Sequence, residues 1–440
     1  MTLTNRSINV SSIPGPQDIK RKVLSNGITL LARSNFNSAS VVVSGYLGAG
    51  SLLDPLDKLG LAHFTALALM RGTNNRDFQG LFNELESAGA SLGFGASVHN
   101  INLGGRCLAE DLPLVANILA DCILEPTFPK DYLERLRAQL LTSLTIRAQD
   151  TAEMASLTFD QLLFPGHPYG LPEDGYLETI RAISRKDMVD FQQMYFRPEN
   201  MAIVIVGAVE PDAAFDLFED KLGKWQNPAE KQIVTLPSVT PPEKTTRQHI
   251  SIPGKSQSDL VMGTLGPKRH APDYLVASIG NNILGQFGMM GRIGDSVREK
   301  AGLAYYASTS VNSWIEAGSW EVSAGVNPVN VDKAIDLIIR ELERFCSEPV
   351  TAEELADSKS NYIGRLPLSL ESNSGVANSI LNLERFNLGL DYLQRYPALI
   401  NAITPEQILE TAQLYINPKN LIIVSSGSKP KRNRQDAKRD

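Results

Sequence analysis

The sequence predicts an α+β protein made of two homologous halves, and an internal repeat is the main reason. The pattern Tyr-x-x-Pro-x-Asn, followed by an apolar run that ends in Gly, occupies 195–207 and returns 220 positions later at 415–427. A Glu-Pro pair also precedes a helical pattern at 125 and again at 348. Repetition over this distance indicates two copies of one folding unit.

A proline-rich segment separates the two copies. The run Leu-Pro-Ser-Val-Thr-Pro-Pro-Glu occupies 236–243 and is typical of a linker. The predicted organisation is an N-terminal extension over 1–17, a first α+β domain over 18–230, a linker over 231–247, a homologous second domain over 248–428 and a disordered basic tail over 429–440. The tail is more simply explained as a solvated chain end than as a binding arm.

Each half carries both strand and helix patterns. The turn signal Asn26-Gly27 between two apolar or alternating runs predicts a hairpin, and the apolar run 40–45 predicts a further strand. The expected helices cover 60–72, 77–89, 112–124, 130–148, 152–163 and 185–195, and the expected strands cover 90–98, 100–108 and 201–207. In the second half we expect a helix to end near Lys300, followed by a turn at Gly302 and a strand.

Composition excludes several classes of protein. A chain of 440 residues is too long for one core, and 42% hydrophobic with 21% charged residues is typical of a soluble globular protein. The net charge of −7 gives no overall basic character, so we expect no nucleic-acid partner. No secretory signal or 18-residue apolar run is visible, which predicts no membrane span. The cytoplasm is the default compartment, with the periplasm left open.

The cysteines do not suggest a metal or disulfide framework. Cys107, Cys122 and Cys346 are few, far apart and odd in number, and no Cys-x-x-Cys pair occurs.

The stretch 60–73 contains a candidate metal-binding residue. It is nearly all apolar, ends at a glycine and contains one polar ring, His63. Taken alone, such a histidine is more often a hydrogen-bonded core residue than a metal ligand.

The residues around His63 resemble the zinc helix of the inverted-zincin metallopeptidases, the family of pitrilysin, insulin-degrading enzyme and mitochondrial processing peptidase. The similar segments are Gly-Ser-Leu-Leu-Asp-Pro at 50–55, Gly-Leu-Ala-His-Phe at 60–64 and Met-Arg-Gly-Thr at 70–73. The family motif His-x-x-Glu-His sets two zinc-binding histidines on one helix face, with a glutamate that activates water. In this chain Ala66 replaces that glutamate and Leu67 replaces the second histidine.

The resemblance also predicts the position of the third ligand. In the family a glutamate on a later helix precedes an Asp-containing turn, which corresponds here to Asp150-Thr151. Counting back from this turn places Leu144 at the ligand position, and no acidic residue lies between Glu134 and Asp150. A catalytic zinc needs about three protein ligands and an open position. We therefore expect no metal and no other cofactor in this chain.

A second motif of the family is present in the second half. The segment Arg-Glu-Lys-Ala-Gly-Leu-Ala-Tyr over 298–305 is similar to its arginine–tyrosine pair, which lies opposite the zinc across the chamber between the two halves of the active unit. This implies that Arg298 clamps substrate and that Tyr305 supports the oxyanion, with Tyr306 on the other strand face. Taken alone, Arg298 could equally be a surface charge and Tyr305 a sheet aromatic.

The glycines at 285–291 add a weaker likeness. Gly285, Gly288 and Gly291 resemble a short form of the family's flexible loop, which implies contact with bound peptide; a plain turn is the alternative. The resemblance further implies a mostly antiparallel sheet in each half with helices on one face, and half of a clam-shell overall.

Together these features imply a division of labour between two chains. Some bacterial members of the family split the active unit, and this chain is similar to the subunit without the zinc site. We expect it to be inactive alone, to pair with a homologous His-x-x-Glu-His chain that holds the zinc, and to grip extended or unfolded peptides. The alternatives are a structural or assembly subunit, such as the core subunits of respiratory complexes, and a homodimer that binds peptides without hydrolysis.

Overall fold

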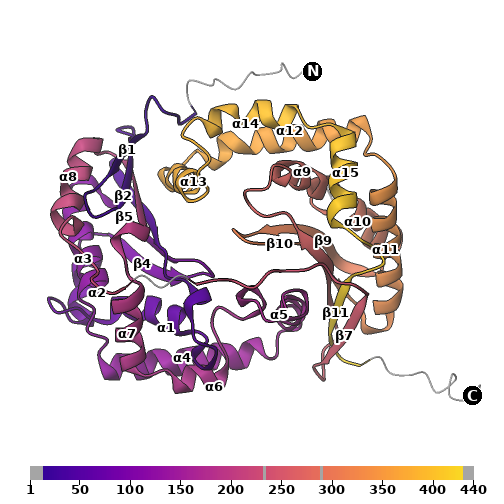
Figure 1. Ribbon diagram of the computed structural model, residues 1–440, viewed down its shortest axis with the longest axis horizontal. Helices are drawn as coiled ribbons and strands as arrows, with labels where there is room; N and C mark the ends of the chain where they lie inside the picture. The colour runs from indigo at the N-terminus through magenta and orange to yellow at the C-terminus, as the bar shows by residue number, and fades with distance from the viewer. Residues whose placement is uncertain (1–12, 231–233, 288–290, 430–440) are drawn as a thin grey trace, which may run out of the picture. The chain divides into compact units, whose positions relative to one another are not determined.

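The computed structural model describes residues 13–230, 234–287 and 291–429 (Figure 1). The predicted extension over 1–17 therefore lies largely outside the described residues, as do part of the linker and all but the first residue of the predicted tail over 429–440. No helix in the described ranges is long and apolar enough to cross a membrane.

The chain forms two compact units, and each combines segments that are distant in sequence. The first unit contains Met1–Thr142, Pro172–Thr235 and Arg365–Pro397, and the second contains Ser143–Leu171, Leu236–Gly364 and Ala398–Asp440. The changes from one unit to the other near 142 and 364 fall within the long helices α4 and α12 (Lys130–Arg147 and Ala352–Ser369).

The sheet of the first unit has six strands in the order β1-β2-β6-β3-β5-β4. Their bounds are β1 Lys20–Val23, β2 Thr29–Ser34, β3 Ser40–Leu47, β4 Ser91–Ala96, β5 Ile101–Leu108 and β6 Met201–Gly207. All neighbours are antiparallel except β2 and β6. The predicted hairpin is confirmed: β1 and β2 pair around Gly27, whose φ of 95° is one that few residues other than glycine adopt.

Helices cover both faces of this sheet. The helices taken wholly from the first half are α1 Leu61–Ala68, α2 Phe78–Ser87, α3 Leu112–Leu124, α6 Leu177–Ala182, α7 Arg185–Tyr195 and α8 Pro211–Leu222. Figure 1 shows α2, α3 and α8 on one side of the strands and α13 (Asn373–Arg385) on the other. Every residue of β6 is buried as a result, and Val204 packs with Ala377 and Ile380 of α13.

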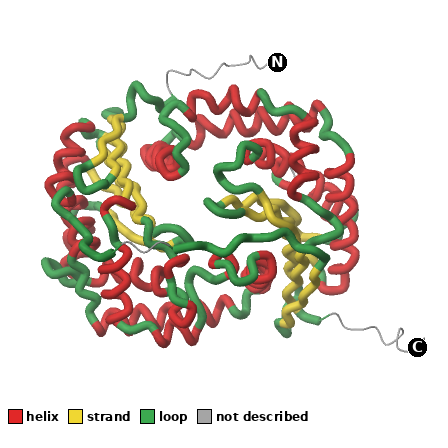
Figure 2. Tube along the Cα trace, viewed as in Figure 1, coloured by secondary structure: helices red, strands yellow, loops and turns green. Residues whose placement is uncertain are grey.

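The second unit repeats the arrangement of five of these strands, β2-β6-β3-β5-β4. Its sheet has the order β7-β11-β8-β10-β9, with bounds β7 Thr246–Ser251, β8 Ser258–Gly266, β9 Ala304–Ser313, β10 Gly318–Val326 and β11 Ile422–Gly427. The single parallel pair, β7 with β11, occupies the place of β2 with β6. The two sheets are coloured yellow in Figure 2.

The helices of the second unit also match those of the first. Helices α9 Tyr274–Gly285, α10 Gly291–Gly294, α11 Val331–Ser347 and α15 Pro405–Tyr415 come from the second half, while α5 Thr151–Leu163 comes from the first half and packs on β8 and β11. Helix α14 (Tyr392–Asn401) follows α13. Each sheet thus has the helices of its own half on one face, and the other face is covered by a helix from the other half.

This arrangement confirms the α+β class with two helix-packed sheets. The exchange of α5 and α13 explains why both central strands, β6 and β11, are buried on both faces. It also means that the packing units differ from the contiguous sequence ranges over which the repeat runs.

Candidate functional site

Helix α1 begins at a partly buried carboxylate, that of Asp54. Asp54 accepts hydrogen bonds from the backbone N–H groups of Gly60 and Ala62, both at 2.8 Å, and so satisfies donors that the helix leaves free at its N-terminus. Gly60 has φ of 90° and lies against the carbonyl of Asp174, which leaves no room for a side chain. Burial raises the pKa of Asp54 to about 7, although these N–H groups act in the opposite direction.

The positions of the zinc motif on α1 hold no set of metal ligands. His63 is partly buried, and burial lowers its pKa while the nearby Asp174 carboxylate acts in the opposite direction. Ala66 is fully buried and Leu67 is partly buried, while Leu144 on α4 is 4% exposed. One imidazole with three aliphatic side chains does not fit zinc. Among the described residues, no group of three or more His, Cys, Asp or Glu side chains is placed to hold a metal ion.

Arg298 lies in a single turn of π-helix, Asp295–Lys300, which directly follows α10. This segment ends at Gly302, where φ is 63° and the backbone N–H donates to the carbonyl of Arg298 at 3.0 Å. The predicted helix end near Lys300 and the turn at Gly302 are therefore confirmed. The Arg298 side chain is 33% exposed, and its Nε lies 3.5 Å from a carboxylate oxygen of Glu299.

A buried ion pair holds the segment that carries Arg298. Arg292, in α10, donates from Nε and Nη2 to the two carboxylate oxygens of Glu354, both at 2.7 Å. Glu354 also accepts from the backbone N–H of Thr351 at the start of α12. These contacts lower the pKa of Glu354 to about 2, and the hydrogen bonds to Arg292 are the largest cause.

Tyr305 projects from the edge strand β9 into solvent. Its side chain is among the most exposed large apolar groups of the described chain, with 83% of its surface accessible. β9 pairs with β10 on one side and stands at the edge of the sheet. The Tyr305 hydroxyl forms no hydrogen bond with the residues that the structure describes, so it is available to an incoming group.

Tyr305 is the extra residue of a β-bulge, because Ala304 lies opposite Val326 of β10 and Tyr306 lies opposite Gly325. Tyr306 is partly buried. Its hydroxyl donates to Asp259 at 2.8 Å, and Gln257 donates to the same oxygen at 2.8 Å. Thr151, at the start of α5, donates to the other oxygen of Asp259, which is 3% exposed. Burial and the Asp259 carboxylate raise the pKa of Tyr306. This network anchors the strand behind Tyr305.

Two of the three candidate loop glycines have a packing explanation. A Cβ on Gly285 would lie 2.6 Å from the backbone nitrogen of Thr309, so only glycine lets α9 approach β9 this closely. Gly291 has φ of 64° and lies against the carbonyl of Ile283. Gly288 lies outside the described residues. Contact of these glycines with peptide remains a prediction.

Sequence patterns did not reveal the polar groups that position these elements. Asp54, Glu354 and Asp259 are ordinary carboxylates in the sequence, and their partners lie up to 108 positions away along the chain, as for Thr151 with Asp259. The spacing of Thr351 and Glu354 is a capping pattern that could have located the start of α12.

Comparison with protein families and curated sequences identifies relatives along most of the chain. The model of the insulinase family, peptidase family M16, matches residues 29–163, and the model of the peptidase M16 inactive domain matches residues 182–362. An uncharacterized zinc protease of Mycobacterium leprae is 23% identical over 410 residues, covering 91% of this chain and 89% of the relative. Mitochondrial-processing peptidase subunit beta of Saccharomyces cerevisiae is 25% identical over 394 residues, with coverages of 84% and 82%.

A solved structure shows the same fold. The crystal structure of a peptidase M16 inactive domain from Pseudomonas fluorescens superimposes with a TM-score of 0.88 at 24% identity, covering 94% of this chain and 99% of that one. The two family models match successive parts of the chain and together span more than half of the sequence. The chain belongs to peptidase family M16, the insulinase family.

Proposed function

We propose that this chain is the zinc-less subunit of a two-chain metallopeptidase. The observation that carries the proposal is the combination of a motif without ligands, at Ala66 and Leu67, with an accessible Arg298 and Tyr305. The match of residues 182–362 to an inactive-domain model supports it, as do relatives named as zinc proteases and as a processing peptidase. A homologous chain with an intact motif would supply the metal and the general base.

The roles of the two residues follow from their chemistry. The Tyr305 hydroxyl would donate a hydrogen bond to the scissile carbonyl oxygen as negative charge develops there, an effect worth about 3 kcal/mol for one well-placed donor. The Arg298 guanidinium has a planar set of donors that suits peptide carbonyls or a terminal carboxylate. Contact of Gly285, Gly288 and Gly291 with the bound peptide is a further part of the proposal. The substrate would be an extended or unfolded peptide.

The test is reconstitution with purified chains. This chain, a homologous subunit that carries His-x-x-Glu-His, and the equimolar mixture are each assayed with zinc and a fluorogenic peptide. We expect hydrolysis by the mixture at a rate that neither chain reaches alone. In the mixture, Tyr305→Phe should lower kcat about 10- to 1000-fold without changing the melting temperature, because the hydroxyl forms no hydrogen bond with any described residue.

Tyr306→Phe is the matched control. It removes a hydroxyl from the neighbouring residue that bonds Asp259, so it should lower stability by about 1 kcal/mol and leave kcat unchanged at temperatures where the fold is intact. Equal kcat for wild type and Tyr305→Phe would remove Tyr305 from the mechanism. A mixture that assembles and stays inert would instead support a structural subunit.

A further inference from the structure

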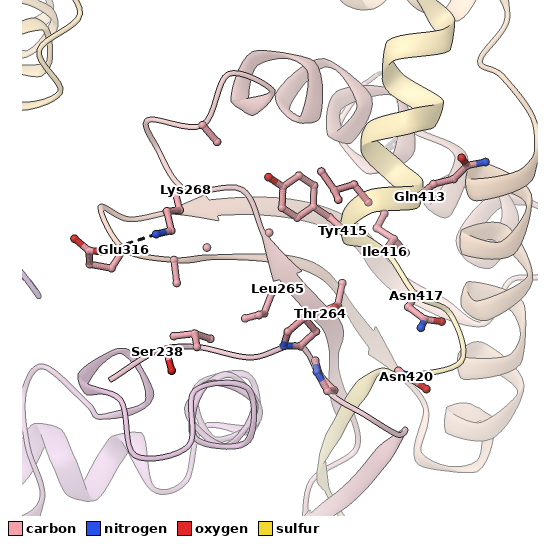
Figure 3. A pocket seen from close by; sticks show the side chains of 18 of the residues that line it. Ser238, Thr264, Leu265, Lys268, Glu316, Gln413, Tyr415, Ile416, Asn417 and Asn420 are labelled. Carbon is pink, nitrogen blue, oxygen red and sulfur yellow. Dashed lines mark ion pairs between the residues drawn. The ribbon is translucent and has the colours of Figure 1, made fainter. Parts of the chain in front are cut away.

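A groove of about 1070 Å³ lies on the second unit, where residues 236–242 pass the end of α15 (Figure 3). Its walls are largely apolar and include Leu265, Leu414 and Ile416, with three prolines of the 236–242 segment. Lys268 and Glu316 form an ion pair of 3.8 Å at one end, and Asn417 and Asn420 lie at the other. A groove of this volume and character is of the size that accommodates small ligands or short peptides.

The internal repeat shows what occupies the corresponding place in the first unit. There the chain after α8 lies across the C-terminal end of α7, the counterpart of α15. The Asn227 side-chain amide donates to the backbone carbonyls of Gln193 and Phe196, both at 2.8 Å. Arg197 donates to the carbonyl of Ala229. A segment with the sequence Trp-Gln-Asn-Pro-Ala thus caps the free carbonyls of this helix end.

In the second unit, the C-terminal end of α15 lacks this cap among the described residues. The repeat aligns Phe196 with Ile416, and among the described residues the donor to the Ile416 carbonyl is the Cys346 thiol, at a distance of 3.7 Å. A thiol is a weak donor. The described residues after β11 are Ser428 and Lys429, and the Ser428 hydroxyl donates to the backbone carbonyls of Ile252 and Lys255.

The surface around the groove indicates that a short extended segment, and not a helix, would bind there. In the first unit α8 packs on β2, whose central residues are buried. The counterpart strand β7 exposes Arg247, Gln248 and His249, so the area equivalent to the α8 contact is polar and solvated. The groove at the end of α15 is apolar, and Leu414 there is 69% exposed. The surface of the second unit that corresponds to the position of residues 225–229 is therefore apolar, whereas the surface that corresponds to the α8 contact is polar.

We propose that this groove binds an extended segment of a partner polypeptide that carries an asparagine between an aromatic residue and a proline. The asparagine amide would donate to the carbonyls of Gln413 and Ile416, as Asn227 does to their counterparts, and the aromatic ring would cover Leu414. This inference rests on the repeat and on the groove, and it is independent of the peptidase role proposed above.

The test uses a synthetic peptide that reproduces residues 222–230, labelled with fluorescein at its N-terminus and titrated with the full chain. We expect saturable one-to-one binding by fluorescence anisotropy. Leu414→Asp should weaken binding at least about tenfold, because it places a charge against the apolar segment. Leu368→Asp is the matched control: Leu368, on α12, is also 69% exposed, and its replacement should leave the dissociation constant unchanged. A peptide with Asp in place of Asn should bind about fivefold to tenfold more weakly, since a carboxylate cannot donate.

The position of the peptide is checked by protection of Cys346. This thiol lines the groove, whereas Cys107 and Cys122 are buried. At pH 9 we expect saturating peptide to slow alkylation of Cys346 by N-ethylmaleimide at least about fivefold while the buried thiols stay unmodified. Absence of saturable binding, equal weakening by the two leucine variants, or unchanged alkylation of Cys346 would each overturn the proposal.

Discussion

The ion pair between Arg292 and Glu354 offers the most direct test of how the Arg298 segment is held. Arg292 is buried, with 8% of its side chain exposed, and its charge is met by both oxygens of Glu354. Glu354→Gln keeps the size of the side chain and one acceptor oxygen but removes the charge. The Arg292 guanidinium is then left buried without a counter-ion at this position, which is unfavourable.

The size of the effect can be worked from the pKa. For Glu354, a change from the ordinary value of 4.5 to about 2 corresponds to roughly 3.4 kcal/mol, at ~1.4 kcal/mol for each tenfold change in acidity. The Glu354 side chain is 29% exposed, so solvent screens part of this interaction. We therefore expect Glu354→Gln to lower the free energy of unfolding of the second unit by about 2 kcal/mol at pH 7.

The assay is urea unfolding followed by tryptophan fluorescence. Trp314 and Trp320 lie in the second unit, and Trp320 is buried against Phe345, which Arg292 also contacts. The sign of the pH effect follows from the lowered pKa: the stabilisation is complete above the unfolded pKa near 4.5 and is lost as pH falls toward 2. The difference between wild type and variant should therefore be constant from pH 5 to 7 and shrink below pH 4.5.

Glu353→Gln provides the control. Glu353 is the preceding residue of α12, is exposed, and forms no ion pair with the residues that the structure describes. Its neutralisation should change stability by less than about 0.5 kcal/mol. Equal effects of the two substitutions, or a Glu354→Gln deficit that persists unchanged down to pH 3, would refute the account of the buried pair.

Three further expectations follow from the site. Ala66→Glu with Leu67→His should not create tight stoichiometric zinc binding, measured by metal analysis after dialysis, because α4 supplies no third ligand; one bound zinc per chain would contradict the ligand assignment. Gly285→Ala should cost about 1–3 kcal/mol in thermal unfolding, since the new Cβ meets the Thr309 backbone at 2.6 Å, and an unchanged melting temperature would show that α9 can shift. Burial raises the pKa of Asp54 to about 7, so the wild type loses stability as pH rises from about 4 through 7. Over that range Asp54→Asn should become more stable relative to wild type. A difference in the free energy of unfolding that does not change with pH would disprove this.

Local sequence was sufficient for the features that depend on neighbours in the chain. The turn at Gly27 requires positive φ and the turn at Gly302 ends a helix, so each could be predicted and each is present. The bulge of β9 at Tyr305 was not predicted. The repeat predicted two related units, and five strands of the first sheet do share their order with the second sheet, with the parallel pair in the same place. Ala66 and Leu67 stand where the resemblance places the Glu and the second His of the zinc motif, and this assignment stays a prediction.

The exchange of helices could not be predicted in this way. Helix α5 covers the sheet of the second unit and α13 covers that of the first, although α5 comes from the first half of the sequence and α13 from the second. The choice is made by the summed burial of many apolar groups against β6 or β11, and no short pattern encodes it.

The internal repeat and the residues that resemble the family motifs can be read from residue order alone. The folded chain was needed to show which carboxylates lie beside which cations, which glycines are required by packing, and where the groove at the end of α15 is left open. Those features depend on contacts between residues as far apart as Cys346 and Ile416, or Thr151 and Asp259. Such contacts form only when the chain folds and brings these segments together, at a cost in conformational entropy.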